Sequence, residues 1–296
     1  MSLPSERRTR HVSIKILAVA LLVLISVPIA ASGTQFEASV APEGRYLVKL
    51  HPSFFFTSAF FTEDGKAHSM CDVTGLLYFE LPVQVQYGVT GSLSAGAILP
   101  VGWTYQEEKE RADPIHRLAV RELWLTLQHR WLTFPFVSSS ALQVKIPLAK
   151  KRSWEDGLRI GDGQIDVYPA YHFDYFSSSH FWYIQASVGY KYRFEDEDGE
   201  KPFDEVKLYA KGGYELLRDL RMRFFVYADL ADFRNGKYAD DNRSFFEREG
   251  SLHAFGYGVS FWPRPSFRME FTTGGDWSGR NRYRGIEWRV GYAKIF

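Results

Sequence analysis

The chain contains little cysteine and almost no net charge. Cys71 is the single cysteine among 296 residues, which excludes a disulfide framework and a thiolate metal site within one chain. Lysine and arginine number 36 against 35 aspartates and glutamates, so the formal net charge is +1. This balance gives no electrostatic reason to expect a nucleic-acid partner.

Long hydrophobic runs are also missing, apart from one near the N-terminus. Residues 16–30 are apolar, a run of about 15 residues that falls short of the ~20 needed by a membrane-spanning helix. Arg7 and Arg8 precede this run, and small residues follow it up to Gly33. The pattern is typical of a secretory signal peptide, so we expect cleavage after residues 1–31; a retained membrane anchor is the alternative.

Aromatic residues, in contrast, are abundant, with 17 Tyr, 24 Phe and 8 Trp making up 17% of the chain. Transmembrane β-barrels place such rings in girdles at both membrane interfaces. No linker rich in proline or serine divides residues 46–296, so we expect them to form one all-β domain, a closed transmembrane antiparallel barrel. Residues 32–45 are expected to form a periplasmic segment or a small hatch in the lumen.

Apolar and polar residues alternate along much of the chain, as in strands that have one apolar and one polar face. Between Leu77 and Tyr87, for example, the odd-numbered residues are apolar or aromatic and most of the even-numbered residues are polar. We expect about twelve strands, at residues 46–61, 76–87, 91–105, 116–128, 141–149, 164–176, 181–193, 204–216, 222–233, 252–261, 267–274 and 283–296. An even number of strands predicts that both termini lie in the periplasm.

The predicted connections alternate between short and long. The short ones are residues 88–90, 177–180, 217–221 and 262–266, with 129–140 as an oversized member; the long, polar ones are 62–75, 106–115, 150–163, 194–203, 234–251 and 275–282. Outer-membrane barrels have short periplasmic turns and longer extracellular loops. A soluble β-sandwich, the alternative, predicts neither this alternation nor so many aromatic residues.

Four prolines fall inside the predicted strands. Pro82, Pro100, Pro147 and Pro169 each remove one backbone hydrogen-bond donor from a ladder. We therefore expect bulges or strand bends at these positions.

The last predicted strand ends on an aromatic residue. Trp288, Tyr292 and Phe296 occupy its apolar face, which Lys294 interrupts. A terminal aromatic residue on such a strand resembles the signal by which bacterial outer-membrane barrels are recognised for insertion. We expect the barrel-assembly machinery as a partner during insertion, and lipids and lipopolysaccharide of a Gram-negative outer membrane as partners afterwards.

The polar faces of the predicted strands carry charges of both signs. We expect these residues to line the lumen: Glu80, Glu122, Lys145, Asp166, His172, Asp174, Lys191, Arg193, Lys207, Lys211, Arg223, Asp229, Arg268, Glu270, Glu287 and Arg289. Either they border a passage for a small-molecule solute, or they form internal ion pairs that fill a narrow barrel. The sequence favours neither reading.

Two local patterns suggest other chemistry. His172, Asp174, residues 177–179 and His180 contain the residue types of a Ser/His/acid hydrolase, but the serines fall in a predicted turn away from the other two groups. Residues 194–205 resemble a calcium loop, except that Phe194 occupies the first position, where a carboxylate is required. We therefore predict no catalytic residues, cofactor or metal site, although divalent cations at the acidic loop 195–205 stay an open question.

A family resemblance rests on the order of several short motifs. They are Glu63-Asp-Gly65, Glu80-Leu-Pro-Val-Gln-Val-Gln-Tyr-Gly-Val-Thr90, Leu99-Pro100, Lys145-Ile-Pro147, Gly161-Asp-Gly-Gln-Ile-Asp-Val167, Gly189-Tyr-Lys-Tyr-Arg193 and Lys211-Gly-Gly-Tyr214. Together they resemble the outer-membrane barrel family named for the meta-pathway of phenol degradation. The resemblance implies a channel for passive uptake of small, hydrophobic or aromatic molecules. The alternatives are a structural or surface-interaction barrel with a filled lumen and, third, a lipid-modifying enzyme.

Overall fold

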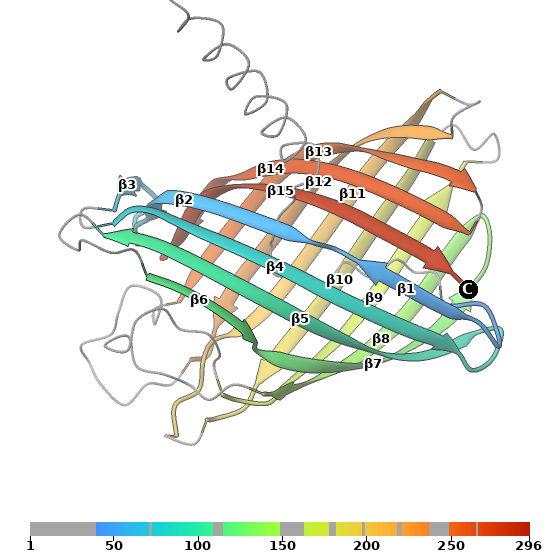
Figure 1. The fold of residues 1–296 in the computed structure, drawn as a ribbon, viewed down its shortest axis with the longest axis horizontal. Coiled ribbons are helices and arrows are strands. Elements are labelled where there is room, and N and C mark those ends of the chain that lie inside the picture. Colours follow the sequence, from blue (N-terminus) through green and yellow to red (C-terminus); the bar gives the residue numbers. More distant parts are fainter. Residues whose placement is uncertain are drawn as a thin grey trace, which may run out of the picture.

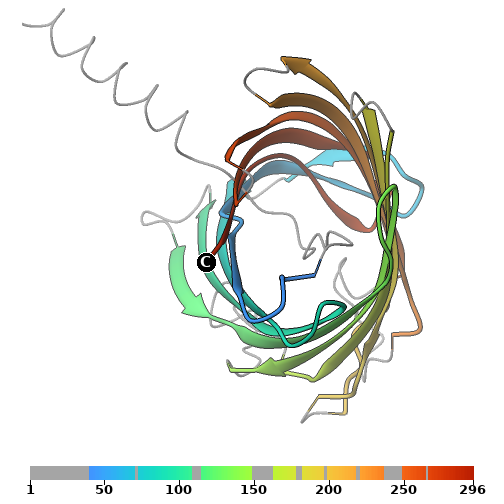
Figure 2. The same ribbon diagram turned by 90° about the vertical axis from the view of Figure 1, so that its right-hand side faces the viewer.

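The described part of the chain forms one antiparallel β-sheet that closes on itself (Figures 1 and 2). The computed structural model describes residues 40–70, 73–108, 115–148, 163–177, 182–196, 199–217, 221–236, 249–264 and 266–296. Its strands are β1 (Tyr46–Leu50), β2 (Ser53–Phe61), β3 (Ala67–Ser69), β4 (Val73–Gly88), β5 (Leu93–Glu108), β6 (Ile115–Val120), β7 (Glu122–Leu132), β8 (Phe136–Pro147), β9 (Asp166–Phe176), β10 (Trp182–Arg193), β11 (Asp204–Leu217), β12 (Met222–Arg234), β13 (Gly250–Arg264), β14 (Phe267–Arg280) and β15 (Arg282–Ile295). Within these ranges, no helix is long and apolar enough to cross a membrane.

The strands occupy twelve positions around the barrel. Both β1 and β2 pair with β4 and β15, so together they form one position, and β6 and β7 share another because both pair with β5. The short strand β3 pairs only with the end of β2. Pairing of β15 with β1 and β2 joins the last strand to the first and so closes the sheet into a barrel. The prediction of a twelve-stranded antiparallel barrel is confirmed.

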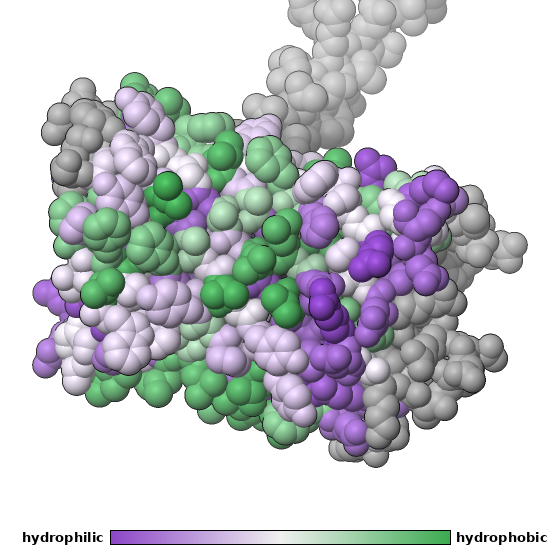
Figure 3. All heavy atoms as spheres, turned by 180° about the vertical axis from the view of Figure 1, so that it is seen from behind, coloured by the Kyte–Doolittle hydropathy of each residue, from purple (hydrophilic) through white to green (hydrophobic). Residues whose placement is uncertain are grey.

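Alternate residues of each strand point into and out of the barrel. On β9, His172 is 2% exposed whereas Tyr171 is 44% exposed. Exposed apolar side chains such as Leu125, Leu142 and Val188 continue this outward set on other strands. Figure 3 shows that apolar side chains cover much of the outer wall and that hydrophilic ones gather toward one end. The inner wall is polar instead, as in outer-membrane barrels.

Three of the four strand prolines lie beside interruptions of the ladder, as expected from their missing donors. The break between β1 and β2 lies opposite Pro82, whose carbonyl accepts a hydrogen bond from the His51 N–H at 3.2 Å. The break between β6 and β7, at Arg121, lies opposite Pro100 and shifts the register by one residue. At Pro169 the pairing of β9 with β10 is interrupted without a register shift.

Pro147 closes β8 instead of bending it. It is the last residue of the strand and lies opposite Glu122. The next residue, Leu148, still donates to the Arg121 carbonyl at 3.0 Å, so Pro147 occupies the alternate position that faces away from β7, beyond the last β8–β9 pair at Lys145 and Asp166.

Two predicted connections were wrong. Residues 129–140 are no oversized turn, because β7 and β8 extend into them and leave only residues 133–135 between the strands. Residues 275–282 are no long loop, because β14 and β15 extend until Asn281 alone joins them. Asn281 adopts φ 51°, a left-handed conformation that asparagine tolerates better than most residues. The strict alternation of short and long connections therefore fails at this last hairpin.

The start of the described chain turns into the barrel opening before β1 (Figure 2). Val40 and Ala41 are buried, and Glu43 forms a bridge with Gly88 at the end of β4. A side chain on Gly88 would collide with the Pro42 carbonyl oxygen, so this close approach requires glycine.

Candidate functional site

The inner wall carries the residues that the sequence analysis selected. The structure describes all 16 of them, and each is buried or half-buried on the less exposed face of its strand. These are Glu80, Glu122, Lys145, Asp166, His172, Asp174, Lys191, Arg193, Lys207, Lys211, Arg223, Asp229, Arg268, Glu270, Glu287 and Arg289. Most of them pair with a group of opposite charge.

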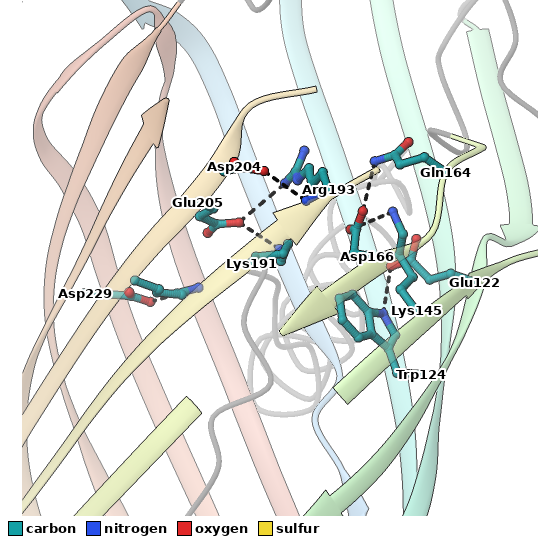
Figure 4. A network of polar contacts seen from close by, with 11 residues as sticks. Glu122, Trp124, Lys145, Gln164, Asp166, Lys191, Arg193, Asp204, Glu205 and Asp229 are labelled. Atoms are coloured by element: carbon teal, nitrogen blue, oxygen red, sulfur yellow. Dashed lines mark hydrogen bonds and ion pairs between the residues drawn. The ribbon is translucent and has the colours of Figure 1, made fainter. Parts of the chain in front are cut away.

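One group of pairs lies toward the end of the barrel that carries the long connections (Figure 4). Lys145 on β8 contacts Asp166 on β9, its register neighbour, at 2.8 Å between Nζ and Oδ2. Gln164 donates to the same carboxylate at 3.3 Å. The indole N–H of Trp124 donates to Glu122 at 3.1 Å. The Lys145–Asp166 pair therefore links the inner faces of β8 and β9, while the indole of Trp124 fixes the Glu122 carboxylate within β7.

The adjoining strands β10, β11 and β12 continue this network. Glu205 accepts from Lys191 at 2.7 Å and from Arg193 at 3.4 Å. The backbone N–H of Arg193 donates to Asp204 at 2.9 Å. Lys207 lies 3.7 Å from Asp229 on the next strand. Because Asp166, Glu205 and Asp229 each lie beside a cation, most of the charge at this end of the interior is compensated.

A second group lies toward the end with the short turns. Lys211 on β11 donates to both carboxylate oxygens of Glu270 on β14, at 2.9 and 2.8 Å. Arg268 binds the same carboxylate, and Arg289 donates to Glu287 at 2.8 Å. The Lys211–Glu270 pair spans β12 and β13, so it crosses the curved interior and is not a neighbouring-strand contact.

Aromatic rings accompany the second group of charges inside the barrel. Tyr183, Phe225 and Tyr227 form a buried cluster, with exposures of 3% or less. The Lys211 ammonium lies 3.8 Å from the centroid of the Phe225 ring, and the Arg289 guanidinium lies 5.5 Å from that of Tyr227. Cations over ring faces are attracted by the ring quadrupole. The aromatic content of the sequence predicted girdles at the membrane interfaces and not this internal cluster. The position of Tyr183 among the polar residues of β10 is the signal that indicates it.

Two further inner residues were missed. Lys49 is 2% exposed and, with His51, borders a small cavity together with Asp174, Lys211, Arg268 and Glu270. The alternation of Leu47, Lys49 and His51 with Tyr46, Val48 and Leu50 is the signal that could have selected them.

The hydrolase and calcium patterns gain no support from the described residues. His172 and Asp174 share the buried face of β9, whereas residues 178–180 lie outside the described ranges. In the acidic loop, residues 197 and 198 also lie outside them. Among the residues that the structure describes, no three His, Cys, Asp or Glu side chains are grouped to hold a metal ion.

One serine–histidine contact was not foreseen. His253 Nδ1 lies 2.7 Å from the Ser278 hydroxyl, between register neighbours on β13 and β14. A catalytic base also needs a third group to orient it. In the described part of the chain, no carboxylate hydrogen-bonds to His253, so the pair is an incomplete triad.

The fold is that of known outer-membrane channels. The outer membrane channel COG4313 from Pseudomonas putida F1 superposes with a TM-score of 0.69 at 11% identity, covering 90% of this chain and 100% of that one. The NanC porin (TM-score 0.48, 8% identity, 83% and 98% covered) and the CymD monoaromatic hydrocarbon channel (0.44, 12%, 86% and 89%) are more distant and support no further conclusion.

Comparison of sequences, in addition, identifies a family. A search of curated proteins found no match. Residues 42–291, which include nearly the whole barrel, match the family described as "Putative MetA-pathway of phenol degradation". The match spans well over half of the chain, and it agrees with the resemblance carried by the short motifs. The chain therefore belongs to this family.

Proposed function

We propose that this barrel is an outer-membrane channel for passive uptake of small, hydrophobic or aromatic molecules. The observation that carries the proposal is the internal cluster of Tyr183, Phe225 and Tyr227, bordered by Lys211 and Arg289. Phe176 and Tyr209 pack against this cluster and are only partly buried, so their rings offer an apolar solute contacts that a purely charged lumen lacks. Membership of the family and the similarity to a channel barrel support the same function.

Flux into proteoliposomes tests the proposal directly. We expect vesicles that contain the chain to take up benzyl alcohol faster than protein-free vesicles, with glucose entering more slowly because it lacks an aromatic ring. Equal rates with and without protein, for both solutes, would contradict the channel.

The chain's placement in the cell is part of the proposal. We propose removal of residues 1–31, insertion into the outer membrane with both termini in the periplasm, and contact with lipopolysaccharide and the barrel-assembly machinery. The burial of Val40 and Ala41 supports a small hatch formed by residues 32–45. Fractionation should recover a chain shortened by about 31 residues in the outer membrane. Recovery from the soluble periplasm would contradict this placement.

A filled, structural barrel is the second candidate, and the buried Lys145–Asp166 and Glu205 pairs favour it. Lipid hydrolysis is the third, and only the His253–Ser278 contact favours it. We propose that the chain is not an enzyme, and its similarity to an outer membrane channel supports this. Release of fatty acid from phospholipid by the wild type, abolished in Ser278→Ala, would reverse this conclusion.

A further inference from the structure

Lys49 is a buried cation that contacts no counter-ion among the described residues. Its side chain points from β1 into the barrel, where the register places it between Gln84 of β4 and Ala293 of β15. It is 2% exposed, yet among the described residues its ammonium makes no hydrogen bond or ion pair. Burying an ammonium without a partner is costly, so a protein that keeps one commonly supplies an anion to it.

The cavity beside Lys49 has an excess of positive charge. Three cations (Lys49, Lys211 and Arg268) and two carboxylates (Asp174 and Glu270) border it. Lys211 and Arg268 both bind Glu270, whereas Asp174 attracts Lys49 without forming an ion pair or hydrogen bond with it, so Lys49 keeps the capacity to bind a further anion. The excess of one positive charge matches a singly charged anion.

A second polar group at the cavity also lacks a partner. The Nε2 atom of His51 is buried and has no hydrogen-bond partner within the described ranges. In the tautomer protonated at this atom, it can donate to an acceptor in the cavity. Lys49 and His51 are two residues apart on one face of the chain and both border the cavity.

The volume of the cavity and its other bordering residues limit which ligand groups can bind there. Its volume of about 30 Å³ has room for about two water-sized groups, the size of a carboxylate. Tyr209 also borders it, and the Tyr209 ring lies 6.0 Å from that of Tyr227 in the aromatic cluster. An aromatic ring attached to a bound carboxylate can therefore lie against the Tyr209 ring.

We propose that Lys49 and His51 form a binding site for the carboxylate of a small aromatic acid, with the ring of the acid lying toward Tyr209. This inference rests on the proposed function, because it names the class of solute that the channel selects. It extends that function from neutral aromatic molecules to singly charged aromatic acids.

Calorimetric titration of the purified full chain in detergent tests the site, with benzoate as the probe and benzamide as its uncharged counterpart. We expect the wild type to bind benzoate more tightly than benzamide. Lys49→Gln should weaken benzoate binding roughly 10- to 100-fold, the effect of losing a charge-assisted hydrogen bond, and should leave benzamide unchanged. Lys49→Arg should restore much of the benzoate affinity.

Lys66→Gln is the matched control, because Lys66 is exposed and pairs with Asp64 outside the barrel wall. It should bind benzoate as the wild type does. A thermal unfolding scan checks that Lys49→Gln is folded, and we expect no loss of stability because the change removes an unpaired buried charge. If that variant fails to fold, the comparison of benzoate with benzamide in the wild type still tests whether the site prefers a carboxylate.

Equal affinity of the wild type for benzoate and benzamide, or unchanged benzoate binding in folded Lys49→Gln, would overturn the site. Two further results distinguish an error in the carboxylate site from an error in the proposed channel function. Flux of benzyl alcohol without selective benzoate binding would defeat only the carboxylate site. Benzoate binding that depends on Lys49, without flux of any solute, would defeat only the channel.

Discussion

Lys145 and Asp166 face each other across β8 and β9, and both side chains are about 2% exposed. The pair lies in the inner wall, where its charges have little access to water. Removing one partner of such a buried pair leaves an uncompensated charge, which typically costs more than the pair itself contributes.

We therefore predict that Lys145→Met alone lowers the free energy of unfolding by about 3–5 kcal/mol. The double variant Lys145→Met with Asp166→Leu should recover most of this loss, because it removes both charges and keeps the volume filled. Unfolding in a denaturant series in detergent measures both effects. If Lys145→Met were as stable as the wild type, water would have more access to the Asp166 carboxylate than its 2% exposure indicates.

The orientation of β10 gives a second prediction. Val188 is 47% exposed on the outer wall, whereas its neighbour Ser187 is half-buried on the inner wall. Val188→Arg should cost about 2–4 kcal/mol if it faces lipid near the bilayer midplane, and Ser187→Arg should cost much less. Reversible folding into vesicles measures the difference. Equal losses in the two variants would mean that the outer wall does not face lipid.

A third prediction concerns Phe296. Its side chain is 59% exposed, while its backbone N–H donates to the Tyr46 carbonyl at 2.9 Å across the barrel closure. If the barrel-assembly machinery recognises the Phe296 ring, Phe296→Ala should lower the amount of heat-modifiable barrel in cells. The substitution keeps the backbone hydrogen bond, so it separates recognition of the ring from closure of the ladder, whereas deletion of Phe296 removes both. Normal barrel levels in Phe296→Ala would argue against the assembly signal.

The fourth prediction concerns ion selectivity. Asp174 is 4% exposed and borders the same cavity as Lys49, so Asp174→Asn increases the positive charge there. In planar bilayers we expect the reversal potential to move toward anion preference, because charge that lines a pore sets the barrier for ions. Uptake of benzyl alcohol should change little, because this solute is uncharged.

A barrel with a filled lumen would give different results in both the flux and the conductance measurements. The wild type would pass neither benzyl alcohol nor glucose, and Asp174→Asn would lose stability without any change in conductance. That combination would favour the structural barrel.

Local sequence patterns determined the strands and their faces. The twelve predicted segments overlap the twelve strand positions, because the alternation of side chains has a period of two that depends only on neighbouring residues. The same alternation placed Asp166, His172 and Asp174 on one face of β9. The ends of strands were harder to predict. The turn at Asn281 and the break at Arg121 depend on how far the adjacent strands continue to pair.

The tertiary structure alone decided which inner residues meet. Lys211 and Glu270 are 59 residues apart and lie on strands separated by two others, so no local pattern relates them. Their contact requires closure of the barrel, since the curvature of the wall and the register of each strand pair set which side chains share the lumen. For the same reason, local alternation determines that Lys49 points inward, but only the closed barrel places it beside a cavity with Asp174, Lys211 and Glu270. Alternation is a local property of a strand, whereas charge pairing inside a barrel depends on the whole circumference.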